Sequence, residues 1–293
     1  SVGVTLDPRL YPKPEDLSPE EEFAQLAHRF PAVERQFEGA KKVREWVSTG
    51  RLQYSSRKTV GQRWCLMSHA AGFLDPLYSR GMSNTFEIIH ALVPRILDAL
   101  ADDDFNEERF RYVEELEQGL LDYNDILVNC SFISFSHFRL WDAVFRVWGS
   151  GNTPGSLRIN NALRTFRADR DASVFDNLEK ATHTGLWWPD SDAFKLVLDG
   201  MAEACAQYES NAIDGDTAAD RIIRLVQESE AVSPEFGWKD VNRRFIYPDQ
   251  RQMKDFLEWA AASPLPELST IGRETLAALR KAGAAAAPEA GNR

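Results

Sequence analysis

A run of small and turn-forming residues between positions 68 and 81 has the composition of a ligand-binding loop. Ala70, Ala71 and Gly72 remove side-chain bulk, which lets a planar or phosphorylated molecule approach the main chain closely. Asp75 and Pro76 then form a rigid turn. A loop of this kind needs a strand before it and a helix after it.

The next residues place the start of a helix beside this loop. Ser79 and Gly81 come directly before an apolar helix that helical spacing predicts from about Met82 to Leu100. The first N–H groups of a helix are unpaired, and the positive end of its dipole favours a negative charge. The segment therefore predicts a site for an anionic group, and the alternative is a structural turn between a strand and a helix.

The elements before the loop are short. Two strands are predicted between Arg51 and Met67, interrupted at Gly61. Ser18 is predicted to cap a short helix that ends before Pro31, and a second helix is expected over residues 32–47. Residues 1–6 read as a strand already under way, which is rare at the start of a domain. We therefore expect the chain to be part of a longer protein.

Beyond Asp104 the sequence is almost wholly helical. Asp104 is predicted to be the N-cap of a long helix, and the acidic residues that follow read as the solvated face of that helix: Glu107, Glu108, Glu114, Glu115 and Glu117. The glycine-rich string at 149–155 follows a helix and is predicted to be the loop that ends it. The fold class is therefore mainly α with a few β-strands, and the tail at 282–293 is expected to be disordered.

Aromatic residues recur at spacings of three and four along one stretch: Phe132, Phe135, Phe138, Trp141, Phe145 and Trp148. Such a row predicts one helical face that packs in the core. The alternative is that some of the rings line a cavity for an aromatic or acyl substrate. Trp187 and Trp188 allow the same two interpretations, and packing is again the prediction.

Composition excludes several classes of function. The chain has 34 Lys+Arg against 45 Asp+Glu and a net charge of −11, so no basic face for nucleic acid is expected. No apolar run reaches the roughly 18 to 20 residues of a membrane span. Three dispersed cysteines and five histidines form no metal motif, so no metal is predicted. The absence of a leader sequence predicts a cytoplasmic protein.

The segment from Ala70 to Gly81, AAGFLDPLYSRG, resembles the loop of the flavin-dependent halogenases and of related FAD monooxygenases of the aromatic-hydroxylase type. The family pattern reads GDAAGF(I/V)DPL(F/Y)S(S/T)G. Residues 1–8 also resemble the family strand that precedes this region. The resemblance covers about the first 100 residues and is fainter in the helical remainder.

The resemblance implies that the loop binds FAD. Asp75, Pro76 and the backbone at 79–81 would line the isoalloxazine, and the amides of Arg80 and Gly81 would hold a halide. Ala70, Ala71 and Gly72 would pack against the ribityl-phosphate side. The cofactor-binding residues that it implies are His69, Ala70, Ala71, Gly72, Asp75, Pro76, Ser79, Arg80 and Gly81.

Two positions depart from the family pattern. Ser68 and His69 replace the Gly-Asp pair, so the carboxylate that accepts hydrogen bonds from the ribityl hydroxyls is missing, and His69 is the residue that could hydrogen-bond in its place. Arg80 replaces a small hydroxyl residue beside the anion position, where its guanidinium could attract an anion or pair with an acid.

The GxGxxG turn that holds the pyrophosphate in such enzymes is absent from the chain. We therefore expect residues 1–100 to be the C-terminal remnant of a FAD- and substrate-binding domain, an incomplete α/β domain, and residues 101–281 to be an α-helical domain. The partner implied is an N-terminal nucleotide-binding half. A parent of roughly 500 residues or more follows from ordinary domain sizes.

The function implied is FAD-dependent halogenation of an aromatic or other electron-rich substrate, free or bound to a carrier protein, with reduced FAD supplied by a flavin reductase. One alternative is a hydroxylase or monooxygenase that uses no halide. An alternative of another class is a helical interaction module that has lost flavin binding.

Overall fold

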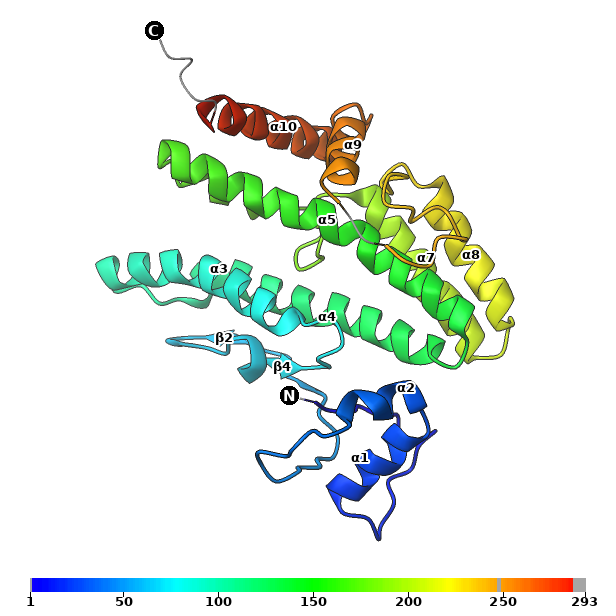
Figure 1. Ribbon diagram of the computed structural model, residues 1–293. Coiled ribbons are helices and arrows are strands. Elements are labelled where there is room, and N and C mark those ends of the chain that lie inside the picture. Colours follow the sequence, from blue (N-terminus) through cyan, green and yellow to red (C-terminus); the bar gives the residue numbers. More distant parts are fainter. Residues whose placement is uncertain (1, 247–248, 287–293) are drawn as a thin grey trace, which may run out of the picture. The chain divides into compact units, whose positions relative to one another are not determined.

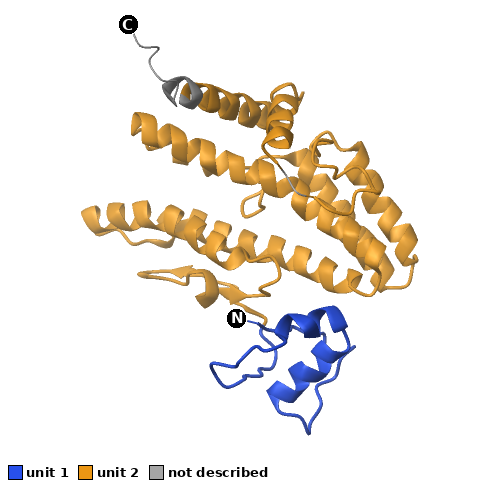
Figure 2. Ribbon diagram, viewed as in Figure 1, with its two compact units in different colours: residues 1–52 blue, residues 53–293 orange. Residues whose placement is uncertain are grey.

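The structure is a computed structural model that describes residues 2–246 and 249–286, with the side chains of 282–286 left out. The chain forms two compact units, Ser1–Leu52 and Gln53–Arg293 (Figure 2). The domain boundary expected near residue 100 falls inside the second unit, within helix α3 (Arg80–Asp102).

The first unit is built on helix α1 (Pro19–His28), whose N-terminus has a capping box. The Ser18 hydroxyl accepts from the Glu21 N–H, and the Glu21 carboxylate accepts from the Ser18 N–H. Helix α2 (Pro31–Glu34) and the 3₁₀ helix η1 (Arg35–Phe37) follow.

Two expectations for the first unit were wrong. The helix predicted over 32–47 ends by Phe37, because Gly39 takes the left-handed backbone with φ of +75° and Phe37 and Trp46 both pack on Phe23. Residues 2–6 form no strand, since no described neighbouring strand pairs with them.

The second unit begins with four strands of two residues each, which confirms the prediction of a few short strands. Strand β1 (Tyr54–Ser55) pairs antiparallel with β4 (Gly72–Phe73), and β2 (Val60–Gly61) pairs antiparallel with β3 (Trp64–Cys65). Ladders this short need support from a neighbouring helix. Helix α4 (Arg111–Ser134) provides it, since the Glu114 carboxylate accepts from the Thr59 N–H at 3.1 Å.

Helices α3 and α4 lie side by side (Figure 1). They enclose the smaller of two hydrophobic cores. The helix predicted from Met82 to Leu100 is confirmed and continues through Pro94. The core includes Ile88 and Leu92 from α3, Val113 and Leu116 from α4, and Val60 from β2. This packing fixes the start of α3 relative to α4.

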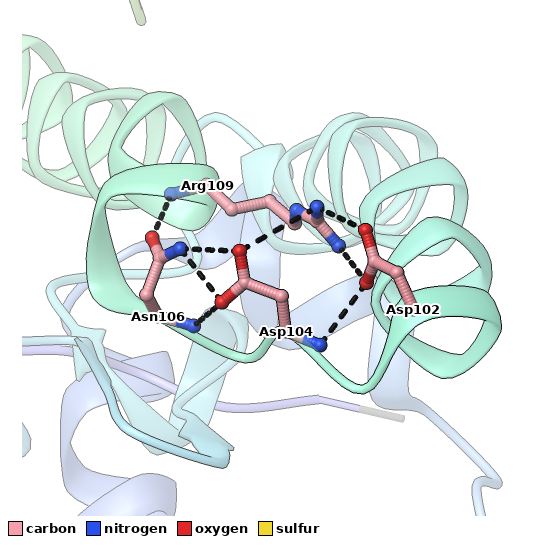
Figure 3. A network of polar contacts seen from close by, with 4 residues as sticks. All are labelled: Asp102, Asp104, Asn106 and Arg109. Carbon is pink, nitrogen blue, oxygen red and sulfur yellow. Dashed lines mark hydrogen bonds and ion pairs between the residues drawn. The ribbon is translucent and has the colours of Figure 1, made fainter.

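The connection between these helices is held by a polar network (Figure 3). Arg109 donates to both carboxylate oxygens of Asp102, at 2.7 and 2.6 Å. Asn106, and not Asp104 as predicted, accepts from the Arg109 N–H and caps the 3₁₀ helix η3 (Glu107–Phe110) that precedes α4. Asp104 instead accepts from the side chain of Asn106.

The rest of the unit is helical, which confirms the mainly α fold class. Its helices are α5 (Phe138–Asp169), α6 (Ser173–Leu178), α7 (Asp192–Glu209), α8 (Gly215–Glu228), α9 (Gln250–Ala261) and α10 (Pro266–Ala286). All of them except α6 contribute residues to the larger core. Residues 282–286, expected to be disordered, continue α10, and 287–293 lie outside the described residues. In the part of the chain that the structure describes, no helix is both long and apolar enough to cross a membrane.

The glycine-rich string at 149–155 is not a loop but the middle of α5, because its glycines let other residues approach the helix closely. A Cβ at Gly149 would collide with the Trp238 ring, and one at Gly155 would collide with the carbonyl oxygen of Trp187. The string therefore serves close packing.

An irregular segment after α8 is fixed by one arginine. Arg146 on α5 is 1% exposed and donates to the carbonyl oxygens of Gly237, Trp238, Asp240 and Arg243. These bonds satisfy backbone acceptors that no helix or strand pairs.

The aromatic row does not lie on a single helix, because a turn after Ser134 separates α4 from α5. Phe135 and Trp141 pack across that turn, with ring centroids 4.9 Å apart. Phe138 is exposed, whereas Trp187 and Trp188 are buried in the larger core as predicted.

Candidate functional site

A cavity of about 270 Å³ lies where the 68–82 segment meets α4. The cavity is lined mostly by residues of that segment and by one side of α4: Ser68, His69, Gly72, Phe73, Leu74, Asp75, Pro76, Ser79, Gly81, Met82, Asn84, Glu117, Leu121 and Asn124. The structure thus brings six of the nine predicted cofactor-binding residues to one hollow. Ala70, Ala71 and Arg80 are not among the lining residues.

One end of the cavity is formed by the 3₁₀ helix η2 (Ser68–Ala70). Ser68 adopts the left-handed conformation, with φ of +47°. Its N–H donates to Oε2 of Glu117 at 3.2 Å, and its hydroxyl accepts from Thr85 at 2.7 Å. These two contacts hold a backbone conformation that is costly for a residue with a side chain.

Strand β4 brings the backbone of Gly72 against α4. A Cβ at this position would lie 2.8 Å from a Leu121 methyl carbon and 3.0 Å from the Tyr54 carbonyl oxygen. The Tyr54 hydroxyl donates to the carbonyl oxygen of His69, which ties β1 to η2. Ala71 is fully buried beside them. The small residues of this stretch therefore allow close approach of strand and helix.

The Asp75–Pro76 turn closes the middle of the segment. Oδ1 of Asp75 accepts from the Leu77 N–H at 2.8 Å, and the Ser79 N–H donates to the Pro76 carbonyl at 2.9 Å. The second oxygen, Oδ2, is buried and has no hydrogen-bond partner in the part of the chain that the structure describes. Burial raises the pKa of Asp75.

The start of α3 forms the other end of the cavity. Ser79 has φ of +53°, and no side chain of residues 2–246 or 249–281 caps this helix of 23 residues. Gly81 lies beneath the His69 ring, since a Cβ there would be 2.7 Å from Nε2 of His69. Because Ser79, Gly81 and Met82 line the cavity, the positive end of a long helix is at its edge.

The side chain of Arg80 has other neighbours. Its guanidinium lies 5.9 Å from the centre of the Trp187 ring. Burial lowers the pKa of Arg80, and the charge of Glu87 opposes that effect. The departure from the family pattern at this position therefore adds no side chain to the lining of the cavity.

The sequence prediction missed the wall that α4 supplies. Glu117 was predicted to lie on a solvated helix face, but it is 2% exposed and lines the cavity with Leu121 and Asn124. The spacing Val113, Glu117, Leu121 places Glu117 on the buried stripe of α4, a signal that helical periodicity could have shown. Burial raises the pKa of the Glu117 carboxyl.

Three residues of the cavity lining each carry a buried oxygen that lacks a hydrogen-bond donor. The buried oxygens Oδ2 of Asp75, Oδ1 of Asn84 and Oδ1 of Asn124 have no partner among the described residues. Buried polar atoms are nearly always hydrogen-bonded in folded proteins. Three of them around one hollow are a reason to expect a ligand that carries N–H or O–H groups.

A wider and shallower hollow of about 540 Å³ lies at the start of α8, lined by His137, Tyr208 and residues 211–216. Its residues are used by the fold, because Asp214 caps α8 and His137 caps α5. Among the described residues, none that lines this hollow carries a buried oxygen without a hydrogen-bond partner, and the start of α8 is capped. The cavity beside α4 is therefore the stronger candidate.

The sequence is similar to those of known halogenases. It is 51% identical over 278 residues to tetracycline 7-halogenase from Kitasatospora aureofaciens, covering 95% of this chain and 49% of that protein. It is 46% identical over 240 residues to monodechloroaminopyrrolnitrin halogenase PrnC from Pseudomonas fluorescens, covering 81% of this chain and 42% of that protein. The chain thus spans about half the length of these curated relatives.

The fold is also similar to that of a solved halogenase. The crystal structure of PltM in complex with phloroglucinol and FAD matches with a TM-score of 0.77 and 34% identity, covering 81% of this chain and 48% of that one. No protein-family model matches the sequence.

Proposed function

Since the chain belongs to the flavin-dependent halogenase family over about half the length of its curated relatives, we propose that it is part of an enzyme that binds FAD and halogenates an aromatic substrate. The observation that carries the proposal is the start of α3, which lacks a side-chain cap among the described residues and lies at the edge of a cavity whose lining residues carry unpaired buried oxygens.

The residues around the cavity fit one side of a flavin. Gly72 and Gly81 let Leu121 and the His69 ring pack directly on the backbone, and all four residues line the cavity. The oxygens of Asp75, Asn84 and Asn124 would accept hydrogen bonds from a ligand's N–H and O–H groups. A cavity of about 270 Å³ is smaller than a site for the whole of FAD, which fits a partial wall.

The start of α3 is the proposed binding position for a negative charge. The backbone N–H groups of Arg80 and Gly81 would hold a halide or the negative charge of a reduced flavin. The attraction comes from backbone dipoles, because the Arg80 guanidinium lies beside Trp187. The His69 ring covers Gly81 and would limit the access of water to that position.

Bound reduced FAD would supply the reaction with O₂ that oxidises the halide. This chain's residues would orient the ring and stabilise the anion. An aromatic substrate fits the relatives, which are named for tetracycline and aminopyrrolnitrin, and PltM, which was solved with phloroglucinol. A flavin reductase would supply the reduced cofactor.

The proposed partner is the nucleotide-binding half that this chain lacks relative to its relatives. Helix α3 exposes a row of apolar side chains at spacings of three and four: Met82, Phe86, Ile89, Val93, Leu97 and Leu100. Its opposite face is buried against α4. A helix that is apolar on both sides is normally covered on both sides. Because Met82 also lines the cavity, the half that covers this row would also complete the cofactor site.

The test is an assay of the chain joined to a nucleotide-binding half, such as that of the 51% identical tetracycline 7-halogenase. The protein is supplied with reduced FAD, O₂, bromide and candidate aromatics such as phloroglucinol. The proposal predicts a brominated product in the mass spectrum. A hydroxylated product formed equally well without halide would favour the monooxygenase alternative. A joined protein that retains no flavin would favour a helical interaction module.

A further inference from the structure

One position of the resemblance has no carboxylate where the flavin-dependent halogenases carry one. Ser68 and His69 stand where the family pattern has Gly-Asp. The resemblance implies that this aspartate accepts hydrogen bonds from the ribityl hydroxyls. The structure does not direct His69 to that role, because its ring lies over Gly81 and edge-on to Phe73, with ring centroids 5.3 Å apart. The resemblance implies an acceptor for the ribityl hydroxyls near residues 68 and 69, and the loop itself supplies no carboxylate there.

Glu117 places a carboxylate near residues 68 and 69 from a different element. It projects from α4, is 2% exposed, and lines the cavity. Its Oε2 accepts from the N–H of Ser68, the residue directly before His69. An acid on the neighbouring helix thus lies beside the position where the loop lacks one.

The surroundings of Glu117 leave it short of donors. Among the described residues no ion pair involves it, and the Ser68 N–H is the donor that contacts it. Burial raises the pKa of Glu117, as expected for a carboxyl with so little compensation. A buried carboxylate is stabilised by several donors, so this one has acceptor capacity left for a ligand.

Glu114, one turn earlier on α4, shows what a purely structural acid looks like here. Its Oε1 accepts from the Thr59 N–H at 3.1 Å, the same kind of contact that Glu117 makes to Ser68. Glu114 does not line the cavity. The two residues therefore form a matched pair that differs in access to the proposed ligand.

We propose that Glu117 accepts hydrogen bonds from the ribityl hydroxyls of the bound flavin and so replaces the aspartate that the loop lacks. The inference rests on the proposed function. It goes beyond that function by assigning a binding residue, on α4, that the sequence resemblance does not supply.

The experiment measures flavin binding by fluorescence titration, in the chain as it stands and joined to a nucleotide-binding half. The ligands are FAD and lumiflavin, which has the same ring system without the ribityl chain. Glu117→Gln keeps an oxygen that can accept from the Ser68 N–H but removes the charge. We expect about tenfold weaker binding of FAD, the size of one lost charge-assisted hydrogen bond, with little change for lumiflavin. Glu114→Gln is expected to bind FAD as the unchanged protein does.

Glu117→Asp keeps the charge on a shorter side chain and is expected to bind FAD between the unchanged protein and Glu117→Gln. If thermal melting shows that Glu117→Gln does not fold, the FAD affinity of Glu117→Asp is compared with that of the unchanged protein instead. Equal affinity would then overturn the inference. If lumiflavin binds too weakly to measure, the comparison of Glu117→Gln with Glu114→Gln on FAD decides alone.

Equal FAD affinity in Glu117→Gln and Glu114→Gln would overturn the inference and leave the proposed function standing. An equal loss for FAD and lumiflavin would also overturn it, because the ribityl chain would then not be the group that Glu117 contacts. If neither form of the unchanged protein binds flavin, the proposed function fails, and the inference fails with it.

Discussion

The two hydrophobic cores of the second unit differ in how completely they are enclosed. The larger core, among α5, α7 and α8, holds Trp188, Phe194 and Met201 with no exposed surface. The smaller core lies under only one side of α3, whose other side exposes Phe86 at 62% and Leu97 at 61%. The cavity lies at the start of α3, where Met82, the first residue of the exposed row, is part of its lining. The difference agrees with the proposed division between an enclosed helical region and a region that would bind its ligand together with another half.

The largest expected effect on stability lies in the enclosed region, at Gly155. A Cβ there meets the carbonyl oxygen of Trp187, which is backbone and cannot swing away. We expect Gly155→Ala to lower the free energy of unfolding by about 3 kcal/mol, measured by thermal or denaturant melting. Gly50→Ala is the control, because nothing lies within 4 Å of a Cβ there. Equal melting of the two variants would contradict the packing of α5.

Next in size is a change on the exposed row of α3. Phe86→Lys should weaken association with the nucleotide-binding half by about tenfold or more. The substitution puts a charge in place of an exposed aromatic side chain that the half would bury. Leu196→Lys, on the exposed surface of α7, is the control. Binding is measured by titrating the separately produced half. If both variants bind like the unchanged chain, the row is not the interface.

A substitution at Gly81 is expected to affect stability less than Gly155→Ala does and to affect ligand binding more than it affects stability. The neighbour of a Cβ there is the end of the His69 side chain, which can move. Gly81→Ala should therefore change the free energy of unfolding by less than about 1 kcal/mol, yet weaken binding of flavin or bromide. The double variant with His69→Ala should recover part of that binding. If Gly81→Ala lost as much stability as Gly155→Ala, the cavity region would be packed as tightly as the larger core, which would contradict the comparison.

The smallest effect concerns pH and the exposed network of Figure 3. The hydrogen bonds from Arg109 lower the pKa of Asp102 to about 2. Because the folded pKa lies below the unfolded value of about 3.9, the contribution is present above pH 4 and is lost as the pH falls towards 2. Asp102→Asn should therefore be slightly less stable at pH 6 and equal at pH 2. A difference that grows on acidification would contradict this assignment.

The sequence predicted the elements that depend on local pattern. The apolar spacing of α3, the capped start of α1 and the run of helices after residue 104 all follow from periodicity and turn chemistry. The glycines at 149–155 were misread as a loop, because their role is contact with Trp238 and Trp187, which lie far away in the chain. Arg146 was missed for the same reason, since its acceptors lie about ninety residues away.

The sequence predicted only the part of the candidate site that consecutive residues form. The loop from His69 to Gly81 carries its own pattern of small and turn-forming residues, whereas Glu117 and Asn124 reach the cavity through the packing of α4. Glu117 was assigned to a solvated face because charge was weighed above its place in the apolar stripe. A charged residue at a buried helical position is thus a signal worth following to a site.

The central claim is that this chain forms one wall of a flavin site and another half completes it. The direct test is FAD retention through gel filtration by the chain, by a separately produced nucleotide-binding half, and by the two mixed. The account predicts close to one FAD per complex in the mixture and much less on either part alone. A mixture that elutes as two separate proteins without flavin would contradict it.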